Sequence, residues 1–231
     1  MQCYFIVHTA VMVWSISVSL VKSDNTNEIL CNKGSYLDKK MKQCLECPGG
    51  RFGESYGLSS SLCDGLCDRG HFCPPGSTSP REQPCPSGRF GSSAGLHTSA
   101  CDGPCSAGYT CPARSISSRG QSCGEVFHYC PQGSGERRDV SLGFYTVGGT
   151  EFNRHGQVQC ERGHYCVQGV KKPCAAGRFG NVSGLYSELC GGWWIRGEGP
   201  KAKEIVPVDG RCPIGKYCPV ASVVPTECPA G

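Results

Sequence analysis

The cysteines of this chain recur at fixed spacings, and this feature limits its possible folds more than any other. The 231 residues include 20 cysteines. Residues 47–84 and 85–122 align without a gap and agree at 21 of 38 positions, every cysteine included. Such repetition is typical of an array of modules, each too small to bury a core unaided. The cysteine density is typical of a disulfide scaffold in an extracellular, oxidising compartment.

Two kinds of cysteine loop make up the repeat. A long loop, CPxGRFG…GL…C, separates its cysteines by 16 positions, and a short loop, CxxGxxCP, separates them by 6. Large insertions fall between these loops and never inside them, which favours loops closed on themselves over interlaced bridges. The spacings therefore predict nine near-neighbour disulfides: Cys31–Cys44, Cys47–Cys63, Cys67–Cys73, Cys85–Cys101, Cys105–Cys111, Cys123–Cys130, Cys160–Cys166, Cys174–Cys190 and Cys212–Cys218.

The fold class predicted from this pattern is a set of small disulfide-rich repeats. We expect an elongated array of short β-hairpins and turns, with little helix after the signal peptide. The predicted segments are a signal peptide (1–23), a partial module (24–46), repeats at 47–84 and 85–122, a divergent repeat (123–173) with a long spacer (131–159), a repeat (174–227) with an insertion (191–211), and the start of a truncated further repeat (228–231).

The two ends of the chain carry their own signals. Tyr4 to Leu20 is mostly apolar and precedes a cleavage signal before Asp24, so we expect a signal peptide. The alternative is an uncleaved signal anchor, and no second apolar run is long enough to span a membrane. Cleavage removes Cys3 and leaves Cys228 without a near partner.

The final residues, CPAG, match the opening of a long loop. They predict a fragment of a longer repeat protein, in which Cys228 lacks its downstream partner. The alternative is an intermolecular bridge through Cys228.

Residues between the cysteines have structural interpretations. Cys-Pro-x-Gly predicts a type I turn with proline second and glycine fourth, and the aromatic residue that follows is expected to pack on the bridge. The GRFG motif carries a recurrent arginine. We expect its stem to lie over the aromatic ring with its charge in water, and the alternative is a ladder for an acidic ligand. The arginines concerned are Arg51, Arg89 and Arg178.

At the level of motifs, CPxGxFG…G…C followed by CxxGxYCPxGSxS resembles the ephrin-receptor-like cysteine-rich repeat. That family is related in style to tumour-necrosis-factor-receptor and EGF-like modules. Residues 143–174 resemble a segment of large secreted or surface repeat proteins of protists. The resemblance covers most of 31–231 and implies a module type that serves as a spacer or interaction surface. It brings no catalytic residue with it.

Catalytic and metal chemistry find little support in the sequence. His71, His128 and His164 each stand two residues before a cysteine, but a Cys–His nucleophile needs a free thiolate, and a recurrent cysteine is better used in a bridge. Only Cys44 and Cys47 have CxxC spacing, and Asp64-Gly65 and Asp102-Gly103 each offer a single carboxylate. We therefore expect no enzyme, metal or cofactor. No lysine or arginine run exceeds two residues, which argues against nucleic acid as a partner.

Two features point to binding and surface display. Adjacent Trp193 and Trp194 open the insertion, either as an exposed anchor for an extracellular protein or glycan ligand or as the plug of the insertion's own small core. Asn181 begins the glycosylation sequon Asn-Val-Ser. The sequence thus predicts a secreted or cell-surface, non-enzymatic array acting as spacer, adhesive or ligand-binding segment. The alternatives are a fragment of a signalling-receptor ectodomain whose membrane and cytoplasmic parts are missing, and a secreted effector acting alone.

Overall fold

The computed structural model describes residues 29–196, 204–208 and 210–229. The predicted signal peptide with Cys3, the middle of the predicted insertion and the last two residues lie outside these ranges. Every regular element in the described residues is a β-strand. None of those residues forms a helix long and apolar enough to cross a membrane.

The strands of the described residues pair into ten antiparallel hairpins. Most strands have only two residues, so a hairpin of this kind is not stable alone in water. The pairs are β1 (Ser35–Asp38) with β2 (Gln43–Glu46), β3 (Arg51–Phe52) with β4 (Gly65–Leu66), β5 (His71–Phe72) with β6 (Gln83–Pro84), β7 (Arg89–Phe90) with β8 (Gly103–Pro104), β9 (Tyr109–Thr110) with β10 (Gln121–Ser122), β11 (His128–Tyr129) with β12 (Arg138–Asp139), β13 (Phe144–Val147) with β14 (Gly156–Gln159), β15 (His164–Val167) with β16 (Val170–Pro173), β17 (Gly192–Arg196) with β18 (Glu204–Val208), and β19 (Lys216–Tyr217) with β20 (Thr226–Glu227).

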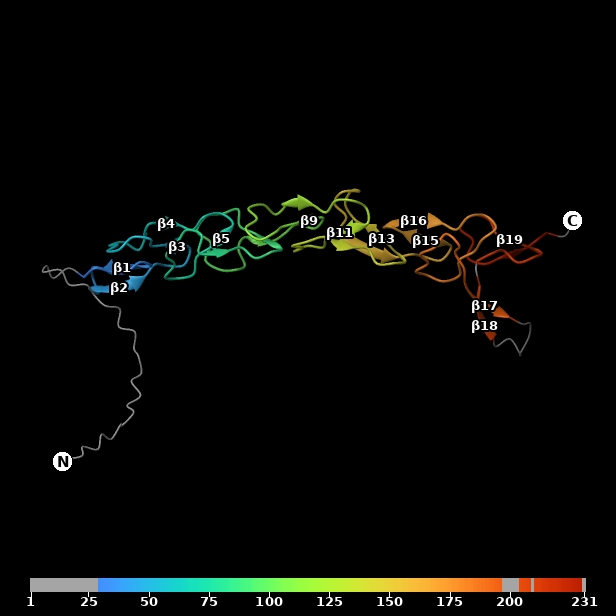
Figure 1. Ribbon diagram of the computed structural model, residues 1–231, viewed down its shortest axis with the longest axis horizontal. Helices are drawn as coiled ribbons and strands as arrows, with labels where there is room; N and C mark the ends of the chain where they lie inside the picture. Colours follow the sequence, from blue (N-terminus) through green and yellow to red (C-terminus); the bar gives the residue numbers. More distant parts are fainter. Residues whose placement is uncertain (1–28, 197–203, 209, 230–231) are drawn as a thin grey trace, which may run out of the picture.

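The hairpins follow one another along a single long axis, from blue to red in Figure 1. Sheets do not merge into a larger sheet, since each pairs only two strands. This architecture confirms the predicted fold class, an elongated array of small disulfide-rich repeats.

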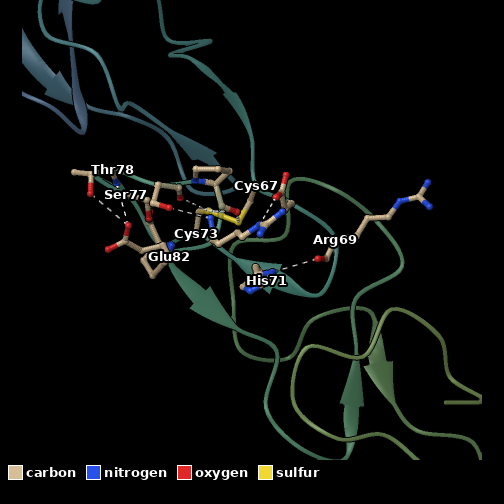
Figure 2. Close-up of a disulfide and its surroundings, with 12 residues drawn as sticks. Cys67, Arg69, His71, Cys73, Ser77, Thr78 and Glu82 are labelled. Carbon is tan, nitrogen blue, oxygen red and sulfur yellow. Dashed lines mark hydrogen bonds and ion pairs between the residues drawn. A yellow bond between two sulfur atoms is a disulfide. The ribbon is translucent and has the colours of Figure 1, made fainter. Parts of the chain in front are cut away.

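Sulfur takes the place of a conventional hydrophobic core. Nine disulfides form within the described residues, and they join the same near-neighbour cysteines that the spacings predict. Figure 2 shows one short-loop bridge, Cys67–Cys73, whose two cysteines are both 0% exposed. In the long loop the opening cysteine, such as Cys47, is equally buried, whereas the closing Cys63 is partly exposed. Phe179 is the one large non-cysteine side chain among the described residues that is fully buried.

Backbone hydrogen bonds join successive hairpins into a stack. The amide of Gly50 donates to the carbonyl of Cys73 at 2.8 Å, and the amide of Gly88 donates to Cys111 at 2.7 Å. Contacts also reach the next hairpin but one. A Cβ added at Gly88 would lie 2.3 Å from the carbonyl oxygen of Gly133, and Gly88 has a φ of +85°. Both the close approach and the left-handed backbone require glycine there.

The Cys-Pro-x-Gly turn differs from the prediction by one residue. Arg51 donates its amide to the carbonyl of Pro48, so proline is the first residue of the turn, not the second. Gly50 is then the third residue, with a φ of +85°. A positive φ at that position is the mark of a type II turn, so the predicted type I turn is wrong, and glycine is required by backbone geometry.

The segment predicted as a long spacer forms a hairpin of its own, β13–β14. The amide of Cys160 donates to the carbonyl of Gly143, as that of Cys67 donates to Gly50 in the regular repeat. This segment therefore stacks like the other hairpins although it contains no disulfide.

Candidate binding surfaces

The histidines that precede cysteines have local structural partners. Nδ1 of His71 lies 3.2 Å from the carbonyl oxygen of Arg69, a contact visible in Figure 2, and His164 makes the same contact with Arg162. Nδ1 of His128 lies 2.9 Å from a carboxylate oxygen of Asp139. The cysteine that follows each of these histidines is in a disulfide.

The residues weighed as metal ligands are likewise used locally. Cys44 and Cys47 belong to two different disulfides. The Asp64 carboxylate accepts the amide of Ser55, and the Asp102 carboxylate accepts the hydroxyl of Ser92 at 2.7 Å. That hydroxyl holds the pKa of Asp102 below its ordinary value. The described residues contain no group of three His, Cys, Asp or Glu placed to hold a metal ion.

The three GRFG arginines have a role that neither sequence interpretation gave. Arg89 Nη1 donates at 2.8 Å to the carbonyl oxygen of Ala100, the residue before the closing Cys101. Cys101 has a φ of +49°, a left-handed conformation that strains a residue with a Cβ. The arginines of the other two long loops donate in the same way: Arg51 to Leu62, and Arg178 to Leu189. Each arginine thus clamps the strained closure of its own loop.

We expect Arg89→Met to lower the free energy of unfolding by about 1 kcal/mol, because the stem remains while the charged donor is lost. Heat denaturation of the oxidised chain, with amide exchange at Cys101 as the local readout, measures the effect. Arg69→Met is the matched control, since the Arg69 side chain extends away from the bridge in Figure 2. Equal losses in the two variants would contradict the clamp.

The insertion lies in the loop of an otherwise regular hairpin, just before Arg211. A backbone β-bridge joins Arg178 to Arg211, as Arg51 pairs with Leu66 in the first repeat. The chain leaves this stem after Gly191 and forms β17–β18, which projects sideways from the array in Figure 1. Trp193 and Trp194 occupy successive positions on β17, opposite Pro207 and Val206. Their side chains lie outside what the structure describes, so the choice between anchor and plug stays a prediction.

Two further predicted residues are on the surface in different degrees. Asn181 of the sequon is half-buried, and its glycosylation stays a prediction. Cys228 is exposed and is the one cysteine of the described residues outside a disulfide.

No protein-family model matches the chain, and no curated protein is significantly similar to it. In the described residues, the fold and its bridges define the class on their own: a disulfide-rich repeat array of short strands, a kind of fold typical of extracellular proteins.

Proposed function

We propose that this protein is a non-enzymatic extracellular repeat array that acts as a stiff spacer and presents one lateral hairpin, β17–β18, to a partner. The observation that carries the proposal is the contrast between the stacked hairpins of the array and this single hairpin projecting from it (Figure 1). The array supplies reach, because each hairpin is fixed by hydrogen bonds to its neighbours.

The composition of β17–β18 supports a binding role. Seven of its ten strand residues are apolar, the two tryptophans included. Its strands pair only with each other, and an isolated two-stranded hairpin is marginal in water. A partner that covers such an apolar element removes its apolar surface from water, which favours binding. Tryptophan is also enriched among the residues that dominate binding energy.

The module type is consistent with such a role. The resemblance to ephrin-receptor-like repeats supports a secreted or surface-displayed array whose ligand is an extracellular protein or glycan. In this proposal the repeated histidines and aspartates serve the loops, as their local hydrogen bonds indicate. No residue is assigned to catalysis.

The test uses arrays of extracellular proteins and glycans probed with the oxidised chain. We expect binding that a Trp193→Ser/Trp194→Ser variant loses at least tenfold, because the apolar anchors are removed. The control is Tyr56→Ser, an aromatic residue 63% exposed in a different loop. Small-angle scattering checks both proteins for a radius of gyration well above the roughly 17 Å of a compact chain of this length. Binding that survives the tryptophan changes, or a compact shape, would contradict the proposal.

A further inference from the structure

A pocket of about 440 Å³ lies where the array departs from its regular repeat. Its walls include the three valines Val126, Val147 and Val170, and its polar side includes Arg154 and Lys171. Strands β13, β15 and β16 are close together here, in the yellow and orange part of Figure 1. A backbone β-bridge joins Tyr145 of β13 to Gly169, which lies between β15 and β16. The regular repeats have no equivalent of this arrangement, because their strands have only two residues.

Arg154 is a cation without a counter-charge among the described residues. Its Nε is buried and has no hydrogen-bond partner, and no ion pair of the described residues includes this side chain. The backbone holds it in place, since its carbonyl accepts the amide of Cys130 at 2.9 Å and the next amide, of His155, donates to Val147. Arg154 lines the pocket and is only half-buried, so an anion that reaches its outer guanidinium nitrogens would gain a charge-assisted hydrogen bond.

Lys171, in contrast, is already paired. Its Nζ lies 3.2 Å from the carboxylate of Glu161 and 4.8 Å from the centroid of the Tyr145 ring. The Tyr145 hydroxyl donates to the same carboxylate oxygen at 3.0 Å. Glu161's own backbone amide, together with these two side chains, holds the pKa of Glu161 below its ordinary value, so the group is a carboxylate at neutral pH. Glu161 is therefore an internal anion that neutralises Lys171 beside the pocket.

We propose that this pocket binds an acidic side chain from an extended segment of a protein partner, with the partner's carboxylate on Arg154. The three valines accept aliphatic residues beside that acid. Glu161 moderates the affinity, because it neutralises Lys171, the second cation that lines the pocket. This site is separate from the β17–β18 hairpin and does not depend on it.

The pocket's own chemistry favours a peptide over an acidic sugar. A sugar ring presents several hydroxyls and needs a matching number of free donors and acceptors. Here the Thr146 hydroxyl donates to the carbonyl of Val126, and the Tyr145 hydroxyl is bound to Glu161. Apart from the two cations, the remaining side chains of the wall are those of the three valines, which suits a carboxylate with an apolar neighbour.

The experiment is a nuclear magnetic resonance titration of the oxidised full chain with the peptide acetyl-Ala-Ile-Glu-Val-Ala-amide, followed at the amides of Gly148 and Gly169. We expect saturable binding that Arg154→Gln weakens at least tenfold, while Glu161→Gln strengthens it about threefold because Lys171 and Tyr145 are released. Arg162→Gln, on the loop before β15, is the control and should leave the affinity unchanged. Protection of the Cys130 amide from hydrogen exchange reports whether the Arg154 variant is folded. The tighter binding expected of Glu161→Gln cannot result from unfolding, so it tests the site independently.

Four results would each overturn the proposal. They are equal binding of the Ile-Gln-Val peptide, an affinity independent of Arg154, tighter binding of N-acetylneuraminate than of the acidic peptide, and no shift at about 10 mM peptide. The Trp193→Ser/Trp194→Ser variant should retain the peptide site, which separates failure here from failure of the hairpin proposal.

Discussion

Gly88→Ala is expected to lower the free energy of unfolding by about 4 kcal/mol. The left-handed backbone at Gly88 costs alanine about 1 kcal/mol. The remainder is a clash, because the new Cβ would lie 2.3 Å from the carbonyl oxygen of Gly133 and can be relieved only by separating two hairpins of the stack. Guanidinium denaturation of the oxidised protein gives the total, and amide exchange at Gly133 reports local loosening.

The chain contains a matched control for this prediction. Gly177 has a φ of +79° and the same hydrogen bonds: its amide donates to Cys218, and its carbonyl accepts the amide of Cys212. A Cβ at Gly177, however, meets nothing within 4 Å. Gly177→Ala should therefore cost only about 1 kcal/mol, the price of the backbone conformation. Similar losses at Gly88 and Gly177 would show that the close approach between hairpins does not contribute to stability.

Sequence spacing was sufficient for the bridges because disulfide geometry is local. A loop that closes on itself has the same length wherever it recurs, so Cys85 and Cys101 predict their own pairing. The role of Gly88 was not predictable in this way, since its neighbour Gly133 is 45 positions away in the sequence. Its recurrence in every long loop was a signal, but only the stack shows which carbonyl requires it.

The candidate sites were predictable to different degrees. The tryptophan pair stands out in the sequence because no other repeat contains one, and the structure places it on a hairpin of its own. The pocket at Arg154 gave no sequence signal. It depends on a hairpin without cysteines, β13–β14, and on the partners that occupy Lys171 but leave Arg154 free. Which of two cations is neutralised is a property of packing and cannot be derived from composition.

Removing a short-loop disulfide should cost more than removing a long-loop one, although loop entropy predicts the reverse order. The entropy model assigns about 3 kcal/mol to the 16-residue separation of Cys85–Cys101 and about 2 kcal/mol to the 6-residue separation of Cys105–Cys111. Burial acts in the opposite direction. Cys105 and Cys111 are both 0% exposed, whereas in the long bridge only Cys85 is 0% exposed and Cys101 is partly exposed. At about 2 kcal/mol for each fully buried side chain replaced by alanine, the totals are about 6 kcal/mol for the short bridge and about 5 kcal/mol for the long one.

The two losses should also differ in reach. Cys111 accepts the amide of Gly88 and donates its own amide to Ser134, so the short bridge holds hairpins on both of its sides. In the long bridge only Cys85 makes such contacts, donating its amide to Gly70 and accepting that of Arg114, because the amide of Cys101 donates to Thr98 within its own loop. Hydrogen exchange on the Cys105→Ala/Cys111→Ala variant should therefore show lost protection at Gly88 and Gly133 together, whereas Cys85→Ala/Cys101→Ala loosens mainly residues 86–101 and the amide of Arg114. Peptide mapping must first show that the other eight bridges are intact in each variant. Exchange confined to the short loop itself would mean that the hairpins are independent modules and that the array is flexible, which would remove the physical basis for a stiff spacer.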